Sequence, residues 1–289
     1  MARVVLVYEL TRLENELYLL ATVDAVRRSY ADPVVFTRDV DDTHKCYKTG
    51  LERIRSSIRS VGLSIIDCLR SESQDFVFRD DDIVIIYGED GAFVNIAKLL
   101  NNQKIITVAT PVRQCGRLMM FTINSFVERS AEILSAEYQV HKKVSIALAL
   151  TSTGQKLEAV NDFHVGRMNI SSSRYSVLQD KNWTAQTSSG VIFSTGTGST
   201  GWEMSARYGD DKYRTRSLSD RRLCMLTREL CFGDRIPTGY HSSPIVLMSE
   251  DLQCRVVADG VLDDAKILIL SSGTIVTITP GYRDVTICV

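Results

Sequence analysis

The hydrophobic periodicity of the chain changes near residue 135, and this change limits the possible folds more than any other feature of the sequence. Before it, short apolar runs alternate with segments of helical spacing, as where Arg3–Tyr8 is followed by Leu13–Tyr30. Further on, Ile83–Tyr87 ends in a glycine-containing turn that precedes a helical segment over Ala92–Leu100. Continuous apolar strands separated by helices are typical of a mostly parallel sheet with helices on both faces. We therefore expect an α/β domain over residues 1–135.

Helical periods almost disappear after residue 135, and short strand-like stretches take their place. Strand signals at this spacing, without helices between them, indicate a sandwich or a barrel-like β domain. We expect this domain over residues 136–289, with a mobile surface loop at the charged, poorly patterned segment Asp210–Arg222. The expected strands are Val144–Leu150, Glu158–Val165, Arg174–Leu178, Gly190–Thr195, Pro244–Met248, Gln253–Val257, Lys266–Leu270 and Thr274–Thr279.

The charge of the chain is nearly balanced, with 34 basic and 35 acidic side chains among 289 residues. This balance excludes a broad electrostatic attraction to nucleic acid or to an anionic membrane, so an anionic ligand must be held by a local site. The first apolar run is interrupted at Glu9, and no run approaches the ~18–20 apolar residues that span a bilayer. We expect a cytoplasmic protein without nucleic-acid or membrane partners.

The segment Gly88-Glu89-Asp90-Gly91 stands between a buried strand and the start of a helix. Open parallel sheets bind ligands beyond the carboxyl ends of their strands, so Asp90 is placed where an acid would meet a substrate. Its carboxylate is a candidate general base that takes the proton of a hydroxyl group. The alternative is that Asp90 caps the helix in a tight turn, and the segment alone favours this structural role.

The segment Gly196–Gly201 combines three glycines with the hydroxyl groups of two threonines and a serine, directly after a strand-like run. Glycines let backbone N–H groups approach phosphate oxygens, so we favour an anion-binding turn over a plain turn between strands. The segment also matches G-x-G-x-x-G, with Asp220 near the position of a ribose-binding acid. The charged sequence that follows does not continue as the long helix of a dinucleotide fingerprint. A Rossmann dehydrogenase is therefore the last of the alternatives.

Asn161 and Asp162 lie side by side at the end of a strand-like stretch. An amide and a carboxylate in this arrangement can bind the hydroxyl groups of a sugar. The same pair can form an Asx turn, and the two residues alone favour the turn. We expect the neighbouring His164 to be structural.

These three segments, in this order across an α/β half and a β half, resemble the NAD kinase family. Gly88–Gly91 is similar to the family's Gly-Gly-Asp-Gly turn, and Asn161-Asp162 is similar to its Asn-Glu pair. Ser194–Trp202 resembles its S-T-P-T-G-S-T-A-Y stretch, and Asp259-Gly260 resembles an Asp-Gly on a late strand. Gly196, in the place of the family's proline, is similar to the mitochondrial-type branch.

The resemblance implies a Rossmann-like α/β N-terminal domain with a mostly parallel sheet, and an all-β, sandwich-like C-terminal domain. It implies phosphoryl transfer from ATP to the 2′-hydroxyl of the adenosine ribose of NAD, which gives NADP. Mg²⁺ or another divalent cation is implied as the cofactor. The partners are then small-molecule nucleotides, and a homodimer or homotetramer is expected.

Residue roles follow from the same resemblance by position. Asp90 is implied as the catalytic base that orients and deprotonates the hydroxyl. The residues implied for NAD binding are Asn161, Asp162, Thr200, Gly201 and Ser205. Those implied for phosphate binding are Gly88, Gly91, Gly196, Thr197, Gly198 and Ser199. Phosphoryl transfer depends mainly on positioning and charge neutralisation, which suits small polar residues and backbone N–H groups.

Two departures from the family pattern keep alternatives open. Glu89 replaces the second glycine of the Gly-Gly-Asp-Gly turn and places a negative charge where polyphosphate would approach, and Ala92 replaces a threonine. They favour a nucleotide-binding protein of the same fold that has lost catalysis. A lipid kinase of the diacylglycerol or sphingosine type, which also has the glycine-rich turn, is a further alternative. The donor (ATP, another triphosphate or polyphosphate) and the choice between NAD and NADH also stay open.

Overall fold

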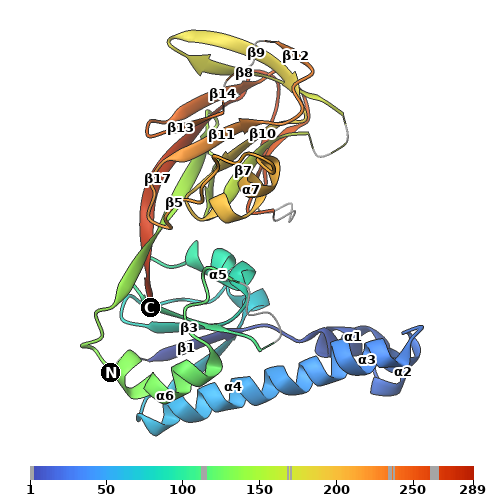
Figure 1. The fold of residues 1–289 in the computed structure, drawn as a ribbon, viewed down its shortest axis with the longest axis vertical. Coiled ribbons are helices and arrows are strands. Elements are labelled where there is room, and N and C mark those ends of the chain that lie inside the picture. Colours follow the sequence, from blue (N-terminus) through green and yellow to red (C-terminus); the bar gives the residue numbers. More distant parts are fainter. Residues whose placement is uncertain are drawn as a thin grey trace. The chain divides into compact units, whose positions relative to one another are not determined.

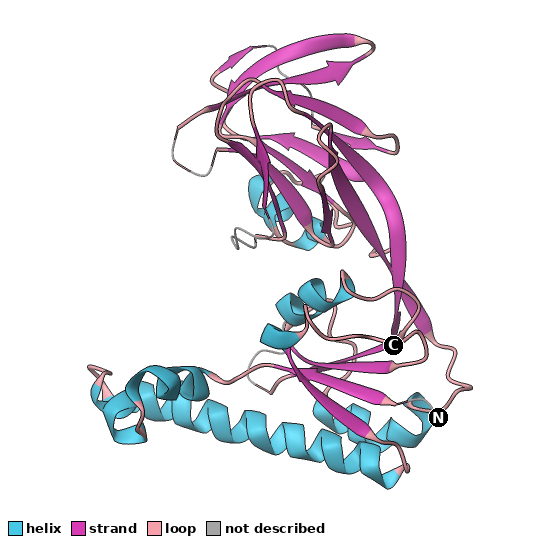
Figure 2. Cartoon of the chain, turned by 180° about the vertical axis from the view of Figure 1, so that it is seen from behind, coloured by secondary structure: helices cyan, strands magenta, loops and turns pink. Residues whose placement is uncertain are grey.

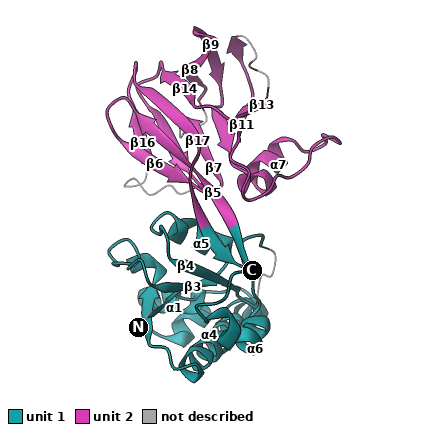
Figure 3. Cartoon of the chain, turned by 90° about the vertical axis from the view of Figure 1, so that its left-hand side faces the viewer, with its two compact units in different colours: residues 1–142, 286–289 teal, residues 143–285 magenta. Residues whose placement is uncertain are grey.

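The computed structural model describes residues 3–111, 116–167, 169, 171–233, 236, 238–260 and 267–289. The chain forms two compact units, Met1–Lys142 with Thr286–Val289 and Lys143–Val285 (Figure 3). The chain passes from one unit to the other within β5 (His141–Thr151) and returns within β17 (Ile275–Cys288). The boundary expected after residue 135 lies shortly before β5.

The first unit alternates strands and helices. Its strands are β1 (Val4–Tyr8), β2 (Ile65–Leu69), β3 (Ile83–Gly88) and β4 (Lys104–Ala109). Its helices are α1 (Arg12–Leu20), α2 (Val23–Arg28), α3 (Pro33–Phe36), α4 (Asp42–Ser60), α5 (Asp90–Ala97) and α6 (Ile123–Ile133), with a π-helical turn η1 (Thr37–Asp41) and a 3-10 turn η2 (Arg70–Glu72).

Four neighbouring strands of this unit are parallel and lie in the order β2-β1-β3-β4. Figure 1 shows α4 and α6 on one face of these strands and α5 on the other. One face is buried through Leu6 and Ile85 against Leu51 and Ile54 of α4 and Phe126 of α6. Because helices cover both faces, β3 is buried along its whole length. The expected mostly parallel α/β fold is confirmed.

The segment expected as one helix over Leu13–Tyr30 is divided into α1 and α2. Ala21 adopts the left-handed conformation with a φ of 61° and ends α1. Thr22 then caps α2, with its side chain accepting a hydrogen bond from the backbone N–H of Ala25. The Thr22 side chain thus bonds one of the N–H groups that lack a partner at the start of a helix, and a second helix begins after it.

No helix in the described parts of the chain is long and apolar enough to cross a membrane.

The second unit is built almost entirely of strands, as Figure 2 shows. Besides most of β5 and β17, its strands are β6 (Lys156–Ala159), β7 (Asp162–Gly166), β8 (Ser173–Gln179), β9 (Asn182–Ser188), β10 (Val191–Ser194), β11 (Leu223–Thr227), β12 (Phe232–Gly233), β13 (Gly239–His241), β14 (Ile245–Ser249), β15 (Cys254–Ala258) and β16 (Ile267–Leu270). A 3-10 turn η3 (Gly198–Thr200) and the short helix α7 (Trp202–Ala206) follow β10.

The strands of the second unit form two sheets around one apolar core. One sheet has the order β12-β9-β8-β14-β17, with β5 beside β17, and the other has the order β13-β11-β10-β7-β15-β16. Buried residues of the first sheet, such as Tyr175 and Leu247, belong to the same apolar cluster as Phe163 and Phe193 of the second. The expected sandwich-like β domain is confirmed.

The segment Asp210–Arg222 differs from its expected form as a surface loop. Arg216 and Leu218 are each only 7% exposed. The backbone carbonyl of Leu218 accepts a hydrogen bond from the N–H of Ser145 at 2.9 Å, which attaches the segment to β5. Although the segment is highly charged, Arg216 and Leu218 are buried and attach it to the interior of the unit.

Candidate functional site

The glycine-containing turn of the first unit connects the carboxyl end of β3 to the start of α5. A Cβ atom on Gly88 would lie 2.7 Å from the Cβ atom of Ala92, so the turn requires a glycine at this position. Glu89 occupies the N-cap position of α5, and its side chain is exposed. Asp90 is the first residue of the helix. The structural alternative in which Asp90 caps α5 is therefore wrong, because Glu89 takes that position.

The Asp90 carboxylate holds the segment that follows β4. Oδ2 accepts a hydrogen bond from the backbone N–H of Arg117 at 2.8 Å, and Oδ1 accepts one from the N–H of Leu118 at 3.1 Å. A Cβ atom on Gly116 would come within 2.2 Å of Oδ1, so the backbone passes directly over the carboxylate. A carboxylate has about four lone-pair positions, so these two bonds leave acceptor capacity for a hydroxyl group.

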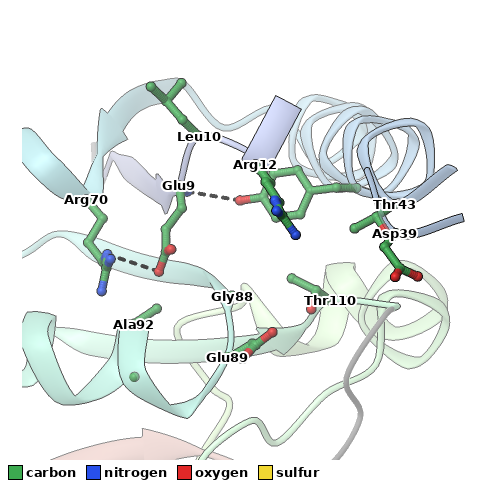
Figure 4. Close-up of a pocket in the computed structure, with 12 residues that line it drawn as sticks. Glu9, Leu10, Arg12, Asp39, Thr43, Arg70, Gly88, Glu89, Ala92 and Thr110 are labelled. Atoms are coloured by element: carbon green, nitrogen blue, oxygen red, sulfur yellow. Dashed lines mark hydrogen bonds and ion pairs between the residues drawn. The ribbon is translucent and has the colours of Figure 1, made fainter. Parts of the chain in front are cut away.

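A cavity of about 720 Å³ opens beside this turn (Figure 4). Each of the four parallel strands contributes a residue directly beyond its carboxyl end: Glu9 after β1, Arg70 after β2, Glu89 after β3 and Thr110 after β4. This edge of a parallel sheet is the usual location of a ligand site. The lining residues are Glu9, Leu10, Arg12, Asp39, Thr43, Tyr47, Arg70, Gly88, Glu89, Gly91, Ala92 and Thr110.

The cavity contains charges of both signs. Arg70 Nε lies 3.0 Å from Glu9 Oε1, and the backbone N–H of Glu9 donates a hydrogen bond to the hydroxyl of Tyr47 at 2.9 Å. Burial raises the pKa of Glu9, Arg70 opposes this rise, and the nearby Glu89 carboxylate adds to it. A ligand with negative charge therefore meets Arg70, which is already paired with Glu9, and is repelled by the Glu89 carboxylate.

In the second unit, Asn161 lies at a break between two strands. The sequence predicts one strand over Glu158–Val165, but the structure divides it into β6 and β7 on either side of Val160 and Asn161. The carboxylate of Asp259 accepts hydrogen bonds from the backbone N–H groups of Val160 at 3.1 Å, Asn161 at 2.6 Å and Asp162 at 3.3 Å. These bonds replace the ladder bonds that a continuous strand would make, so Asp259 fixes the position of the Asn-Asp pair.

The glycine-rich turn packs directly against Asn161. The backbone N–H of Thr195 donates to the carbonyl of Asn161 at 2.8 Å, and the Thr195 hydroxyl donates to the carbonyl of Val160 at 2.5 Å. A Cβ atom on Gly198 would lie 2.1 Å from the Asn161 carbonyl oxygen. The structure thus brings together Asn161-Asp162, Gly196–Ser199 and Asp259, which are distant in the sequence.

Much of the polar backbone of the turn is bonded within the turn itself. The N–H groups of Gly198 and Ser199 donate to the hydroxyl and carbonyl oxygens of Thr195, both at 3.2 Å. The Thr200 hydroxyl donates to the carbonyl of Thr197 at 3.2 Å, and the Ser205 hydroxyl donates to that of Gly201 at 3.4 Å. Thr197 Oγ1 is buried without a hydrogen-bond partner among the described residues. The predicted site residues of the second unit therefore lie in one region, whereas Gly88, Asp90 and Gly91 belong to the first unit. Several hydrogen-bond donors of the turn are used by acceptors within the turn.

Asp162 is a buried carboxyl group near two other acids. Burial, and then the charges of Asp259 and Glu203, raises its pKa to about 7. A carboxyl group that titrates near neutrality can either donate or accept a hydrogen bond. Asp162 is therefore suited to contact a hydroxyl group in either direction.

Trp202, at the start of α7, contacts two side chains. The His164 ring stacks on the indole with centroids 5.5 Å apart, and the Arg228 guanidinium lies 5.0 Å from the indole centroid. Burial lowers the pKa of His164, which keeps the imidazole neutral, and its Nε2 lies 3.2 Å from the carbonyl oxygen of Ser189. His164 thus supports an aromatic side chain next to the glycine-rich turn.

Two residues of the second unit that sequence reasoning missed are Glu203 and Arg216. Glu203 is completely buried, and its Oε2 lies 2.7 Å from the Arg216 guanidinium. No motif marks either residue in the sequence. Within the described residues, no group of three or more His, Cys, Asp and Glu side chains is arranged to hold a metal ion.

Two solved structures of nucleotide kinases share the fold of the chain. An NAD kinase from Archaeoglobus fulgidus in complex with ATP matches over 99% of this chain and 92% of its own, with a TM-score of 0.62 and 15% identity. A yeast NADH kinase complexed with NADH matches over 99% of this chain and 83% of its own, with a TM-score of 0.67 and 14% identity. The protein therefore has the fold of the NAD kinases.

Sequence comparison points in the same direction over a shorter region. The chain is 23% identical over 146 residues to the NAD kinase of Geotalea daltonii, which is 49% of this chain and 51% of that protein. It is 28% identical over 130 residues to the NAD kinase of Cellvibrio japonicus, which is 43% of each. The chain spans about half the length of the curated relatives it matches. No known family profile matches the chain.

Proposed function

We propose that the protein is an ATP-dependent NAD kinase that phosphorylates the 2′-hydroxyl of the adenosine ribose of NAD to give NADP. The observation that carries the proposal is the packing of Asn161 against Gly198 and the attachment of the same residue to Asp259. The segments that contain Asn161, Gly198 and Asp259 resemble the NAD kinase family in sequence, and the fold supports the same assignment. Phosphoryl transfer requires held substrates more than covalent chemistry from the protein, which suits such a fixed frame.

The acceptor is assigned to the second unit. Asn161 and Asp162 hold the hydroxyl groups of NAD, and Thr200, Gly201 and Ser205 continue this surface along η3 and α7. The stretch Gly196–Ser199 contacts phosphate oxygens. The side chain of Asp162, with a pKa of about 7, donates to or accepts from a ribose hydroxyl. These roles rest on the resemblance together with the contacts described above.

Asp90 is assigned as the base that orients and deprotonates the acceptor hydroxyl. The charge-assisted hydrogen bonds from Arg117 and Leu118 hold its carboxylate in one orientation. Gly88 and Gly91 flank it, and we assign their backbone to phosphate contacts.

The cavity beside Gly88 is assigned to the phosphate donor, for which ATP is the proposed choice. Mg²⁺ binds oxygen ligands and is held by one or two carboxylates together with substrate phosphates. Glu9 and Glu89 both line the cavity and provide such carboxylates. A cation bound there with ATP supplies neutralisation of phosphate charge. Arg12 and Arg70 also line the cavity, where they are paired with Glu16 and Glu9.

Several finer assignments rest on the resemblance alone. Gly196 in the place of proline supports membership of the mitochondrial-type branch. We propose a homodimer or homotetramer on the same basis. The proposed cytoplasmic location rests instead on the sequence features described above.

The test is an assay of NADP formation by the purified protein with NAD, ATP and Mg²⁺, run beside a Glu89→Gly variant. Turnover by the native protein supports the proposal and shows that Glu89 is tolerated. Turnover by the variant alone identifies Glu89 as a block. Absence of turnover in both, with phosphorylation of diacylglycerol or sphingosine in lipid vesicles, would replace the proposal by a lipid kinase.

A second candidate function is nucleotide binding without catalysis. It is favoured by the exposed Glu89 carboxylate in the cavity and by the engagement of both Asp90 oxygens with backbone N–H groups. Calorimetric titration distinguishes the two functions. Binding of NAD without binding of ATP and Mg²⁺ supports the second candidate, whereas binding of both with turnover excludes it.

A further inference from the structure

Arg216 is a buried arginine whose guanidinium collects acceptors from separate parts of the second unit. Nη2 donates to the carbonyls of Ser194 at 2.9 Å and Thr195 at 2.7 Å, and it lies 2.7 Å from Glu203 Oε2. Nη1 donates to the carbonyl of Arg222 at 2.8 Å. The two carbonyls of Ser194 and Thr195 are those at the exit of β10, where the glycine-rich turn begins. One side chain therefore holds the base of that turn.

The backbone around Arg216 holds the middle of the same turn. The N–H of Arg216 donates to the hydroxyl of Ser199 at 2.8 Å, and this hydroxyl donates to the carbonyl of Gly196 at 2.7 Å. The Tyr213 hydroxyl donates to the carbonyl of Ser199. A Cβ atom on Gly196 would lie 2.0 Å from the carbonyl oxygen of Ser217, so the two backbones are in direct contact.

The opposite side of the turn contacts Asn161. Thr195 is the shared residue: its carbonyl accepts from Arg216, and its N–H donates to the carbonyl of Asn161 at 2.8 Å. A displacement of the Arg216 guanidinium would therefore move Thr195, which is bonded directly to Asn161. The position of the proposed NAD-binding residues depends on both contacts of Thr195.

Glu203 keeps the guanidinium in place. It is completely buried, on α7 directly after Trp202, and its only described charged partner at ion-pair distance is Arg216. A buried ion pair is often no more stabilising than a well-packed apolar pair, so its presence is better explained by the geometry that it imposes. Burial and the Glu203 charge also raise the pKa of the adjacent Cys224 thiol to about 12, which keeps that neighbour uncharged.

We infer that Arg216 is a positioning residue that holds the turn Gly196–Gly201 in the conformation that binds NAD, and that Glu203 orients Arg216. The inference rests on the proposed function for the identity of the ligand. It assigns a role to the segment Asp210–Arg222, which the motifs leave without one. Arg216 acts through the turn and does not itself touch the reacting atoms.

The test compares four variants of the full chain: Arg216→Met, Arg216→Lys, Glu203→Gln and, as a matched control, Arg214→Met. Arg214 is an exposed arginine of the same segment, and within the described residues its side chain donates to two carbonyls of that segment, those of Asp211 and Tyr213. Two readouts are used: amide hydrogen exchange over residues 194–201, and the dissociation constants for NAD and for ATP with Mg²⁺ by calorimetry.

Arg216→Met is expected to speed exchange over residues 194–201 and to weaken NAD binding by about tenfold, because charge-assisted hydrogen bonds are lost. ATP binding and exchange in the first unit are expected to stay at native levels. Lysine keeps the charge but cannot reach all the acceptors that the guanidinium reaches. We therefore expect the exchange rates and NAD affinity of Arg216→Lys to lie between those of the native protein and of Arg216→Met. Arg214→Met is expected to match the native protein.

Native exchange and native NAD affinity in a folded Arg216→Met protein would overturn the inference. Faster exchange throughout the second unit would also overturn it, since Arg216 would then act on general stability. If Arg216→Met does not fold, Glu203→Gln decides by the same two readouts. A native protein that binds no NAD refutes the proposed function and the role in NAD binding together, and exchange over residues 194–201 then tests the role in holding the turn.

Discussion

The carboxylate of Asp259 accepts a hydrogen bond from the backbone N–H of Asn161 at 2.6 Å. The backbone of Asp259 has a left-handed φ of 57°, and its N–H donates to the carbonyl of Asp162 at 2.9 Å. The two segments therefore fix each other in both directions. The shape of the proposed NAD site depends on an acid that comes after all of the other proposed site residues in the chain.

Asp259→Asn is expected to loosen the break between β6 and β7. Asparagine tolerates the left-handed backbone, and its Oδ1 can still accept the three N–H groups, but the negative charge that strengthens these bonds is lost. The amide NH2 also replaces Oδ2, which accepts the N–H of Val160 at 3.2 Å. We expect a loss of about 1–3 kcal/mol in the free energy of unfolding and weaker NAD binding. Urea unfolding and calorimetry measure the two effects.

The matched control is Asp180→Asn, at an exposed aspartate with a left-handed φ of 46°. It makes the same chemical change in a similar backbone conformation without the three N–H donors. Equal effects of the two substitutions would show that Asp259 has no special role in holding Asn161.

We expect the titration of Asp162 to lower the free energy of unfolding as the pH rises from about 4 to about 7. Its pKa is raised from the ordinary value of 3.8 to about 7 in the folded state, first by burial and then by Asp259 and Glu203. In this window the folded state keeps a proton that the unfolded state has released, so rising pH favours unfolding, and the effect levels off above pH 7. Asp162→Asn removes the titrating group and should remove this slope.

Urea unfolding from pH 4 to pH 8 measures this difference between the native protein and Asp162→Asn. Other groups titrate in both proteins, so only the difference between their curves reports on Asp162. Parallel curves would contradict the raised pKa.

The sequence predicts the parts of the site that carry local signals. Gly88 and Gly198 can be recognised because a glycine between a buried strand and a helix, or among hydroxyl residues, marks a turn that another backbone approaches closely. The alternation of apolar runs with helical spacing likewise predicts the order of strands and helices in the first unit. A strand buried on both faces is apolar throughout, whereas a helix that covers it is apolar at every third or fourth residue.

Other features of the fold and the site depend on contacts between distant residues, and no local sequence pattern indicates them. Arg216 stands in a charged segment that looks solvated, and its burial becomes understandable only with Glu203 and the carbonyls at the end of β10. The division of the first helix at Ala21 is similar, because an alanine in the left-handed conformation is not signalled by its type. The N-cap position of Glu89 was missed because Asp is the more common capping residue.

Asp90→Asn is expected to reduce turnover by about 10²–10⁴-fold, the usual contribution of a general base, while NAD binding stays near the native level. Asparagine can still accept the N–H of Leu118 through Oδ1, so the fold around α5 should persist. Steady-state kinetics of NADP formation and calorimetry with NAD measure the two properties. Asp75→Asn, at an exposed aspartate of the same unit, serves as the control. Native turnover in Asp90→Asn would remove Asp90 from the mechanism.

Two glycines of the same turn should differ in their response to substitution by alanine. A Cβ atom on Gly198 would lie 2.1 Å from the carbonyl oxygen of Asn161, a backbone atom that cannot move without opening the break between β6 and β7. A Cβ atom on Gly201 would meet its nearest neighbour at 3.5 Å, an ordinary contact. Gly198→Ala is therefore expected to destabilise the protein by about 1–3 kcal/mol, as overpacking does, and to abolish NAD binding. Gly201→Ala is expected to keep the native stability. Equal thermal unfolding of the two variants would show that the turn does not pack on Asn161.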